Sequence, residues 1–292
     1  MTSSVAVQST HSERRRRARL IGGLAQIPLI LWTLVTVLPF LLIFLLSFRS
    51  NTDIYSNPLG ISQMSLENYA TAWTGPGGST GMAQYFANTL IAAAVALVLA
   101  LGAGAPAAYF GTQLAPALRK AFTTLFMVAN VVPLVLVVVP YFQIFNAVSM
   151  LNQPLLLGVA YGALALPTTV LVLGAFYADF PHELIEAAAI DGLGELSAFA
   201  RIVAPLSKGA FTAVAMLALV FVWGEAQLGI VLLQDPDAQT LTVGLLGFKG
   251  QFYASLGPLF AGLSLAALPI IGVYLVFQRH VTKGIALGGV FR

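Results

Sequence analysis

Six long apolar stretches, separated by polar segments, dominate the pattern of this chain. Each is close to or longer than the ~20 residues that an α-helix needs to cross a bilayer. They lie at about 21–48, 85–110, 121–145, 154–177, 210–233 and 259–278. The pattern predicts an all-α membrane protein with six transmembrane helices, all in one domain over residues 21–292.

Residues 1–20 precede this domain as a polar tail, which we expect to be largely disordered. The tail ends in a cluster of five arginines, Arg14, Arg15, Arg16, Arg17 and Arg19. A basic run before an apolar stretch is also typical of a secretory signal. The stretch 21–48 is too long for a signal and no small-x-small cleavage site follows it. We therefore expect a retained first helix; twin-arginine export is the weaker alternative.

Proline occurs inside several of the predicted spans. Membrane helices tolerate it because neighbouring helices satisfy the freed backbone groups. Pro133 and Pro140 fall in the same span, 121–145, and predict a kinked or broken third helix.

The basic residues orient the spans. With the N-terminus inside, the tail arginines and seven further residues lie on the cytoplasmic side, and only Arg49 and Lys249 lie outside. The seven are Arg119, Lys120, Arg201, Lys208, Arg279, Lys283 and Arg292. The inverted topology would reverse this distribution, so the positive-inside rule predicts both termini in the cytoplasm. The same distribution explains a pI of about 9.3 without a nucleic-acid partner.

Composition supports the same class. The chain is 58% hydrophobic and 9% charged, whereas a soluble domain carries about 25% charged residues. It has no cysteine, which excludes disulfides, thiolate metal sites and a cysteine nucleophile. We therefore expect a multi-pass protein of a bacterial inner membrane.

The segment 181–209 is the longest cytoplasmic loop that this orientation places between two spans. Pro181 suits the first turn of a helix, and Glu183 and Glu186 fall in its early turns, where the helix dipole favours negative charge. Gly192 is expected to end this helix in a sharp turn. A second short helix should follow and end at Pro205. Spacing alone also allows an interfacial helix that merely connects two spans.

The residues of this loop resemble a known motif. The stretch 186–192 reads Glu-Ala-Ala-Ala-Ile-Asp-Gly, and Ile-Val-Ala-Pro follows at 202–205. This resembles the EAA loop of binding-protein-dependent ABC importers, in particular the maltose-type permeases of the carbohydrate branch. The resemblance departs at Leu193, Ala204 and Gly224, where that family usually has alanine, leucine and asparagine.

The resemblance extends along most of the chain after residue 20. Trp223-Gly224-Glu225 resembles the family's Trp-Asn-Glu, and the sequence 240–245 resembles its Thr-Leu-Pro-Val-Gly-Leu. Further similar stretches lie at 46–49, 65–69, 85–89 and 278–285. The resemblance implies the six-helix architecture of a type I importer permease.

In that family the EAA helix docks in a cleft of a cytoplasmic ATPase. The resemblance implies that Glu186 contacts an ATPase arginine, that Ala187 and Ala188 allow close approach, and that Gly192 makes the turn. Asp191 and Pro205 complete the motif as it stands here. The chain has no G-x-x-x-x-G-K-[ST] phosphate loop, so we expect ATP and Mg²⁺ on a partner chain, no cofactor on this one, and no enzyme activity of its own.

The resemblance also implies the partners: a second permease, which we expect to be a different chain, two ATPase subunits, an external substrate-binding protein and a carbohydrate substrate. Membrane lipid surrounds the spans. Candidates for the substrate path are the polar and aromatic residues within the spans, because such residues are costly there unless they face a cavity. They are Glu225, the only acid we place in a span, with Trp223 and Gln227 near it, and Asn130 and Tyr161.

Other functions stay open at this point. One alternative is that the same machinery carries a polyamine or a glycerol-phosphate-like solute; a strongly acidic path would favour a cation. An ion-coupled secondary transporter or channel would move its solute with this chain alone. An intramembrane enzyme is disfavoured, because the three histidines (His11, His182 and His280) fall at cytoplasmic positions and no paired acids lie in the spans.

Overall fold

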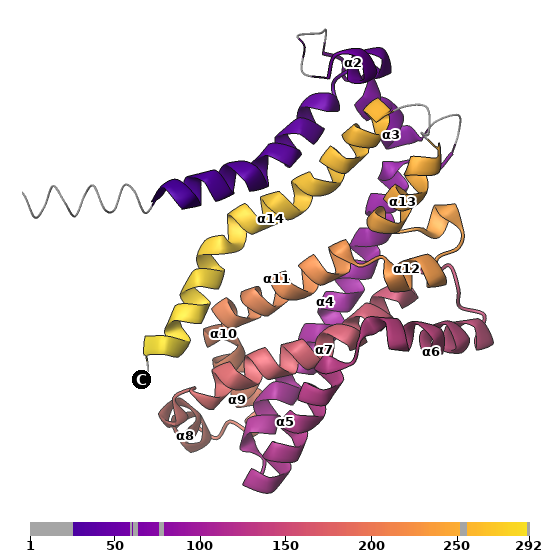
Figure 1. Cartoon of the computed structure of the whole chain (residues 1–292). Coiled ribbons are helices and arrows are strands. Elements are labelled where there is room, and N and C mark those ends of the chain that lie inside the picture. The colour runs from indigo at the N-terminus through magenta and orange to yellow at the C-terminus, as the bar shows by residue number, and fades with distance from the viewer. Residues whose placement is uncertain (1–25, 59, 61–63, 76–78, 252–255, 291–292) are drawn as a thin grey trace, which may run out of the picture.

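The computed structural model describes residues 26–58, 60, 64–75, 79–251 and 256–290. In these residues every regular element is a helix (Figure 1). After a first helix at Gln26–Leu46, the elements are α2 (Asn51–Ser56), α3 (Glu67–Thr74), α4 (Met82–Gln113), α5 (Pro116–Val131), α6 (Leu134–Ala147), α7 (Pro154–Ala178), α8 (His182–Ile190), α9 (Glu195–Ala198), η2 (Phe199–Val203), α10 (Ala204–Leu206), α11 (Lys208–Gly224), α12 (Gln227–Leu232), η3 (Pro236–Ala238), α13 (Leu241–Gln251) and α14 (Leu256–Val290). The predicted basic tail, residues 1–20, lies outside the described residues.

Four of the described helices are long and apolar enough to cross a membrane: Gln26–Leu46, α4, α7 and the Leu256–Gln278 part of α14. Two bent pairs raise the number to six if each pair counts as one span. One pair is α5 with α6, and the other is Glu195–Leu206 with α11. The predicted all-α, six-span architecture is therefore confirmed as a fold class, with two of its spans bent.

The helices α4 and α7 form the centre of the bundle, and small residues let their backbones approach closely. A Cβ at Gly158 in α7 would come 2.6 Å from the carbonyl oxygen of Ala92 in α4. Tyr161 and Leu157 on α7 and Ala96 on α4 are fully buried in the same cluster. Close packing through small residues is the usual way in which membrane helices associate, because lipid supplies no hydrophobic force between them.

The predicted break in the third span occurs at Pro133. The helices α5 and α6 meet there at 90°. Pro133 is not itself helical in conformation and precedes the first turn of α6, whereas Pro140 lies within α6. Neither α5 nor α6 has a buried residue, so this bent span lies at the edge of the chain's own core.

The fifth span is interrupted where we predicted one continuous helix over 210–233. The helix α11 ends at Gly224, Glu225 takes an extended backbone conformation, and α12 begins at Gln227. The apolar pattern of the sequence did not predict this break, because α11 and α12 are both apolar and hydrophobicity does not distinguish one long helix from two consecutive ones. Gly224 and the polar Glu225 mark the point of interruption.

The second short helix of the loop ends at Leu206, one residue beyond the predicted end at Pro205. The chain stays helical through α9, η2 and α10 to Leu206, and the sharp change of direction, 79°, falls at Ser207. Pro205 sits in the first turn of α10, where its missing N–H costs nothing. The widened helical turn η2 precedes it and absorbs the change in the hydrogen-bond pattern.

The two ends of the bundle differ in charge. Figure 1 places α8, α9, α10 and the start of α5 at one end, and α2 and α3 at the other. Arg119, Lys120, Arg201 and Lys208 belong to the first end, whereas Arg49 precedes α2 at the other. This arrangement fits the predicted orientation, with α8 on the cytoplasmic side.

Candidate functional site

The helix α8 ends in a turn that hydrogen bonds hold closed. The amide of Gly192 donates to the carbonyl oxygen of Ala189 (3.0 Å), and the amide of Leu193 donates to that of Ala188 (2.9 Å). Gly192 has a positive φ of 78°, which glycine adopts without strain. These two bonds form a Schellman motif. The predicted turn at Gly192 is therefore confirmed, and its cause is a backbone conformation that few other residues tolerate.

The outer surface of α8 combines acids with uncovered apolar groups. Glu183, Glu186, Ala187 and Asp191 are exposed. Ile190 is 87% exposed at the last turn of the helix. Leu184 of the same helix is 41% exposed, so apolar side chains lie beside the acids on this surface.

Ala187 and Ala188 differ in exposure. Ala188 is 2% exposed, because it faces this chain's own residues. Its small side chain lets α8 pack on its own neighbours, whereas Ala187 lies on the exposed side. Of these two alanines, only Ala187 is available at the surface of α8.

The loop 181–209 packs on the spans through a cluster that includes Phe199. This side chain is 7% exposed. Its ring centroid lies 5.1 Å from that of Tyr109 in α4 and 6.4 Å from that of Tyr177 in α7. The same cluster includes Phe180 and Val203. Phe199 therefore joins the loop to both central spans, α4 and α7.

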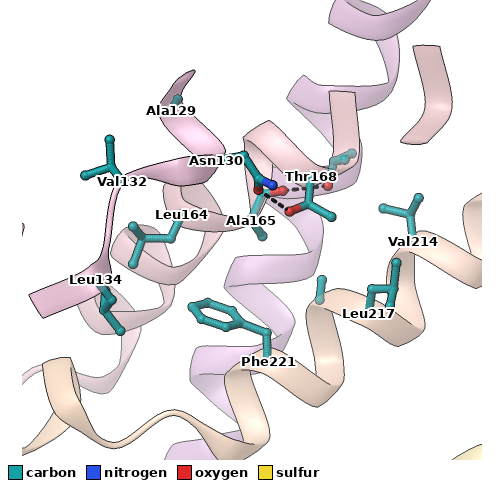
Figure 2. A pocket seen from close by; sticks show the side chains of 12 residues that line it. Ala129, Asn130, Val132, Leu134, Leu164, Ala165, Thr168, Val214, Leu217 and Phe221 are labelled. Carbon is teal, nitrogen blue, oxygen red and sulfur yellow. Dashed lines mark hydrogen bonds between the residues drawn. The ribbon is translucent and has the colours of Figure 1, made fainter. Parts of the chain in front are cut away.

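A second candidate site is a groove of about 250 Å³ at the bend between α5 and α6. Figure 2 shows the groove between the bend and the helices α7 and α11. Its lining is apolar except for three polar side chains: Asn130, Thr168 and Thr169. Phe221 of α11 lies on its opposite wall (Figure 2).

A hydrogen bond joins the side chains of Asn130 in α5 and Thr168 in α7, which both line the groove. The hydroxyl of Thr168 donates to Oδ1 of Asn130 at 2.8 Å, which leaves the amide Nδ2 of Asn130 to donate to a ligand. Thr169 turns its hydroxyl to the carbonyl oxygen of Ala165 in its own helix. No carboxylate and no basic side chain line the groove. The surface is therefore neutral, with an aromatic ring facing hydrogen-bonding groups, which suits an uncharged polyhydroxy ligand.

Glu225 and Tyr161, which we predicted separately, are in contact. Tyr161 donates its hydroxyl to Oε2 of Glu225, and both side chains are buried. The amide of Leu228 donates to Oε1 at 2.9 Å, and that of Gly229 to Oε2 at 3.4 Å. Glu225 thus caps the N-terminus of α12, where the helix favours negative charge.

Trp223 and Gln227 lie apart from the groove. The indole of Trp223 donates to the carbonyl oxygen of Ala266 in α14 at 3.1 Å, and its ring lies 5.9 Å from that of Phe86. Gln227 is exposed at the start of α12. Of the five residues predicted for the substrate path, only Asn130 lines the groove.

Thr168, Phe221 and Ile190 were not among the predicted site residues. Thr168 was detectable as a hydroxyl within a span, beside Pro167. Phe221 carries no such signal, because it is one apolar residue in an apolar helix. Among the described residues, no three His, Asp or Glu side chains lie together in a way that would hold a metal ion.

Comparisons with known proteins agree with these features. The family described as "Binding-protein-dependent transport system inner membrane component" matches residues 100–287. A diacetylchitobiose uptake system permease protein of Streptomyces coelicolor is 31% identical over 92% of this chain and 89% of its own length. A melibiose/raffinose/stachyose import permease protein of Bacillus subtilis is 30% identical over 87% of this chain and 91% of its own length.

A solved structure shows the same fold. It is a chain of a bacterial ABC transporter involved in the import of the acidic polysaccharide alginate. The TM-score is 0.75 at 19% sequence identity, and the match covers 90% of this chain and 97% of the other.

Proposed function

The chain belongs to the binding-protein-dependent transport system inner membrane components, as a multi-pass permease subunit, and we propose that it imports a neutral sugar at the expense of ATP. The observation that carries the choice of substrate is the groove at the α5–α6 bend. Its lining combines Asn130, Thr168 and Phe221 and holds no charged side chain. The two relatives described above are, by their names, permeases for oligosaccharides, which supports the same substrate class.

The neutral groove disfavours the two charged alternatives. A polyamine would require carboxylates near its amines, and Glu225 is occupied by Tyr161 and two backbone amides. A glycerol-phosphate-like solute would require an arginine, a lysine or a cluster of free amides. Neither kind of group lines the groove.

We propose that α8 is the coupling helix that meets a partner ATPase. Glu186 and Ala187 lie on its exposed side, and Ile190 is exposed beyond them. A cleft with an arginine for Glu186 and an apolar pocket for Ile190 would complement this surface. The chain lacks a phosphate-binding loop of its own, so ATP and Mg²⁺ would bind to that partner.

Alternating access follows from how the loop 181–209 is attached. Closure of an ATPase dimer would push α8, and Phe199 would pass the displacement to α4 and α7. Because packed cores switch between discrete arrangements, the push would favour one of two states of the bundle. The groove would then face one side of the membrane in each state.

The proposed assembly also contains a second permease, two ATPase subunits and an external binding protein. The absence of buried residues from α5 and α6 supports the second permease, because these helices flank the groove and would form its other wall with a neighbour. We expect this neighbour to be a different chain.

A ligand screen tests the substrate class. The binding protein from the same transport system would be titrated with neutral oligosaccharides, polyamines and phosphorylated glycerol derivatives, and hits would be tested for uptake. We expect saturable binding and uptake of a neutral oligosaccharide. Uptake of a polyamine or a phosphate ester in preference to sugars would overturn the proposal.

A further inference from the structure

The segment 232–241 joins α12 to α13 on the predicted outer side, and hydrogen bonds hold its backbone at two points. The first point is Asn152, in the turn between α6 and α7. Its side-chain Oδ1 accepts from the backbone amides of Gln234 (2.6 Å) and Asp235 (2.9 Å). Its backbone amide donates to the carbonyl oxygen of Leu232 (2.9 Å). One residue thereby ties two outer loops together through three bonds.

Asn152 has the backbone conformation that this role requires. Its φ is 58°, in the left-handed region that asparagine tolerates better than most residues with a Cβ. This conformation lets both the backbone amide and the side chain of Asn152 bond to segment 232–241. A side chain without an acceptor would lose two of the bonds, and a β-branched residue would also strain the turn.

The second point is the start of α4. Asn88 is 3% exposed, and its Nδ2 donates to the carbonyl oxygens of Asp237 (2.8 Å) and Gln239 (2.9 Å). The adjacent Thr89 accepts from the amide of Leu241 at 2.7 Å. These bonds join Asn88 and Thr89 to the backbone at Asp237, Gln239 and Leu241, at positions that neither the proposed coupling helix nor the groove explains.

Segment 232–241 has exposed side chains on its outer side and is joined through α12 to the buried Glu225. The side chains of residues 234–237 are exposed. On the inner side, α12 leads from Leu232 back to the amides of Leu228 and Gly229, which bind Glu225, the partner of Tyr161 in α7. Hydrogen bonds therefore connect the segment directly to α4, and through α12 and Glu225 to α7.

We propose that Asn152 and Asn88 are positioning residues that lock segment 232–241 in one shape, so that an external binding protein seated on the segment acts on α4, α7 and α12 as one rigid unit. This inference rests on the proposed function, because it assigns the segment a role in stimulation from outside. Without these hydrogen bonds, the segment would change shape when the binding protein presses on it, and the displacement would not reach α12.

The test uses the full complex, reconstituted with its ATPase and its binding protein, and compares two substitutions of Asn152 with one control substitution. Asn152→Gly keeps the positive φ and removes the acceptor. Asn152→Asp keeps an acceptor and a residue that tolerates the turn. Asn146→Ala serves as the matched control, because Asn146 is exposed in the nearby α6.

For Asn152→Gly we expect the binding-protein concentration that gives half-maximal stimulation of ATP hydrolysis to rise roughly tenfold, the effect of losing about one net hydrogen bond. ATP hydrolysis without binding protein should stay the same. Hydrogen exchange of the peptide 232–241 should become roughly tenfold faster, by the same reasoning. Asn152→Asp should restore both quantities, and Asn146→Ala should change neither.

The outcomes separate the two proposals. If the wild-type complex is stimulated and Asn152→Gly matches it in half-maximal concentration, the positioning role is overturned and the proposed function stands. If Asn152→Gly loses hydrolysis with and without binding protein, the residue is merely structural, and the inference is likewise overturned. A wild-type complex that its binding protein does not stimulate would overturn the proposed function together with this inference.

Discussion

Tyr161 donates a hydrogen bond to the carboxylate of Glu225, 64 positions further along the chain, inside the packed contact of α7 with the end of the fifth span. The same carboxylate accepts from the amides of Leu228 and Gly229. The only acid predicted inside a span is therefore fully engaged within its own chain. This geometry supports a role in holding the break between α11 and α12.

Substitution of Glu225 separates capping from substrate contact. Glu225→Ala should lower the free energy of unfolding by about 1–3 kcal/mol, because it leaves Tyr161 and the start of α12 without an acceptor. Glu225→Gln keeps one carbonyl oxygen and should lose less. The measurement is the thermal stability of the purified complex alongside uptake kinetics. A raised KM at unchanged stability would instead place Glu225 in contact with the substrate.

Substitution of Gly158 tests the close contact of α4 with α7. Gly158→Ala places a Cβ 2.6 Å from the carbonyl oxygen of Ala92, which is backbone and cannot move aside alone. We expect a loss of about 1–3 kcal/mol in stability. Gly174→Ala is the matched control in the same helix, since nothing lies within 4 Å of its added Cβ. Equal melting temperatures for the two variants would contradict the packing described.

Substitution of Gly192 tests the turn of the coupling helix. The position is sterically open but has a φ of 78°, so the cost of Gly192→Ala comes from the backbone alone. We expect about 1 kcal/mol, expressed as faster hydrogen exchange at the end of α8. Gly194→Ala should have little effect, because Gly194 has a φ of −70°. A larger effect at Gly194 than at Gly192 would show that the turn is held differently.

Substitutions in the groove test its chemistry. Asn130→Ala and Phe221→Ala should each raise the apparent KM for the transported sugar roughly tenfold, the effect of losing one hydrogen bond or one stacking contact. Thr212→Val is the control, because Thr212 lies in α11, bonds to its own helix at Lys208 and does not line the groove. If Thr212→Val raises KM as much as Asn130→Ala, the groove is not the sugar site.

The spans and the coupling turn were predictable from sequence for the same reason: each depends on local chemistry. Apolar length defines a span, Pro133 fixes its own φ, and Gly192 permits the positive φ of the turn. The break at Glu225 was not predictable, because Glu225 is held there by a long-range bond from Tyr161, which the local sequence does not reveal. The groove likewise depends on the angle between α5 and α6, which brings Asn130 opposite Phe221. A single span reveals neither of these partners.

Removal of the exposed carboxylate of Glu186 tests the proposed role of α8 as the coupling helix. Glu186→Ala, or Gly192→Asp, should leave membrane insertion and assembly intact and abolish stimulation of ATP hydrolysis by the binding protein. Glu186 is exposed and outside the spans, so its removal should cost little stability. Glu183→Ala, on the first turn of the same helix, is the control. Full stimulation in an assembled Glu186→Ala complex would refute the assignment of α8 as the coupling helix.

We propose that this chain imports its solute only together with an ATPase. The most direct measurement is uptake of labelled sugar into liposomes that contain this permease with its partner permease, with and without the ATPase subunits and internal ATP, in the presence of the binding protein. We expect uptake that requires all of these components. Accumulation of the sugar in liposomes that contain this chain alone would contradict it.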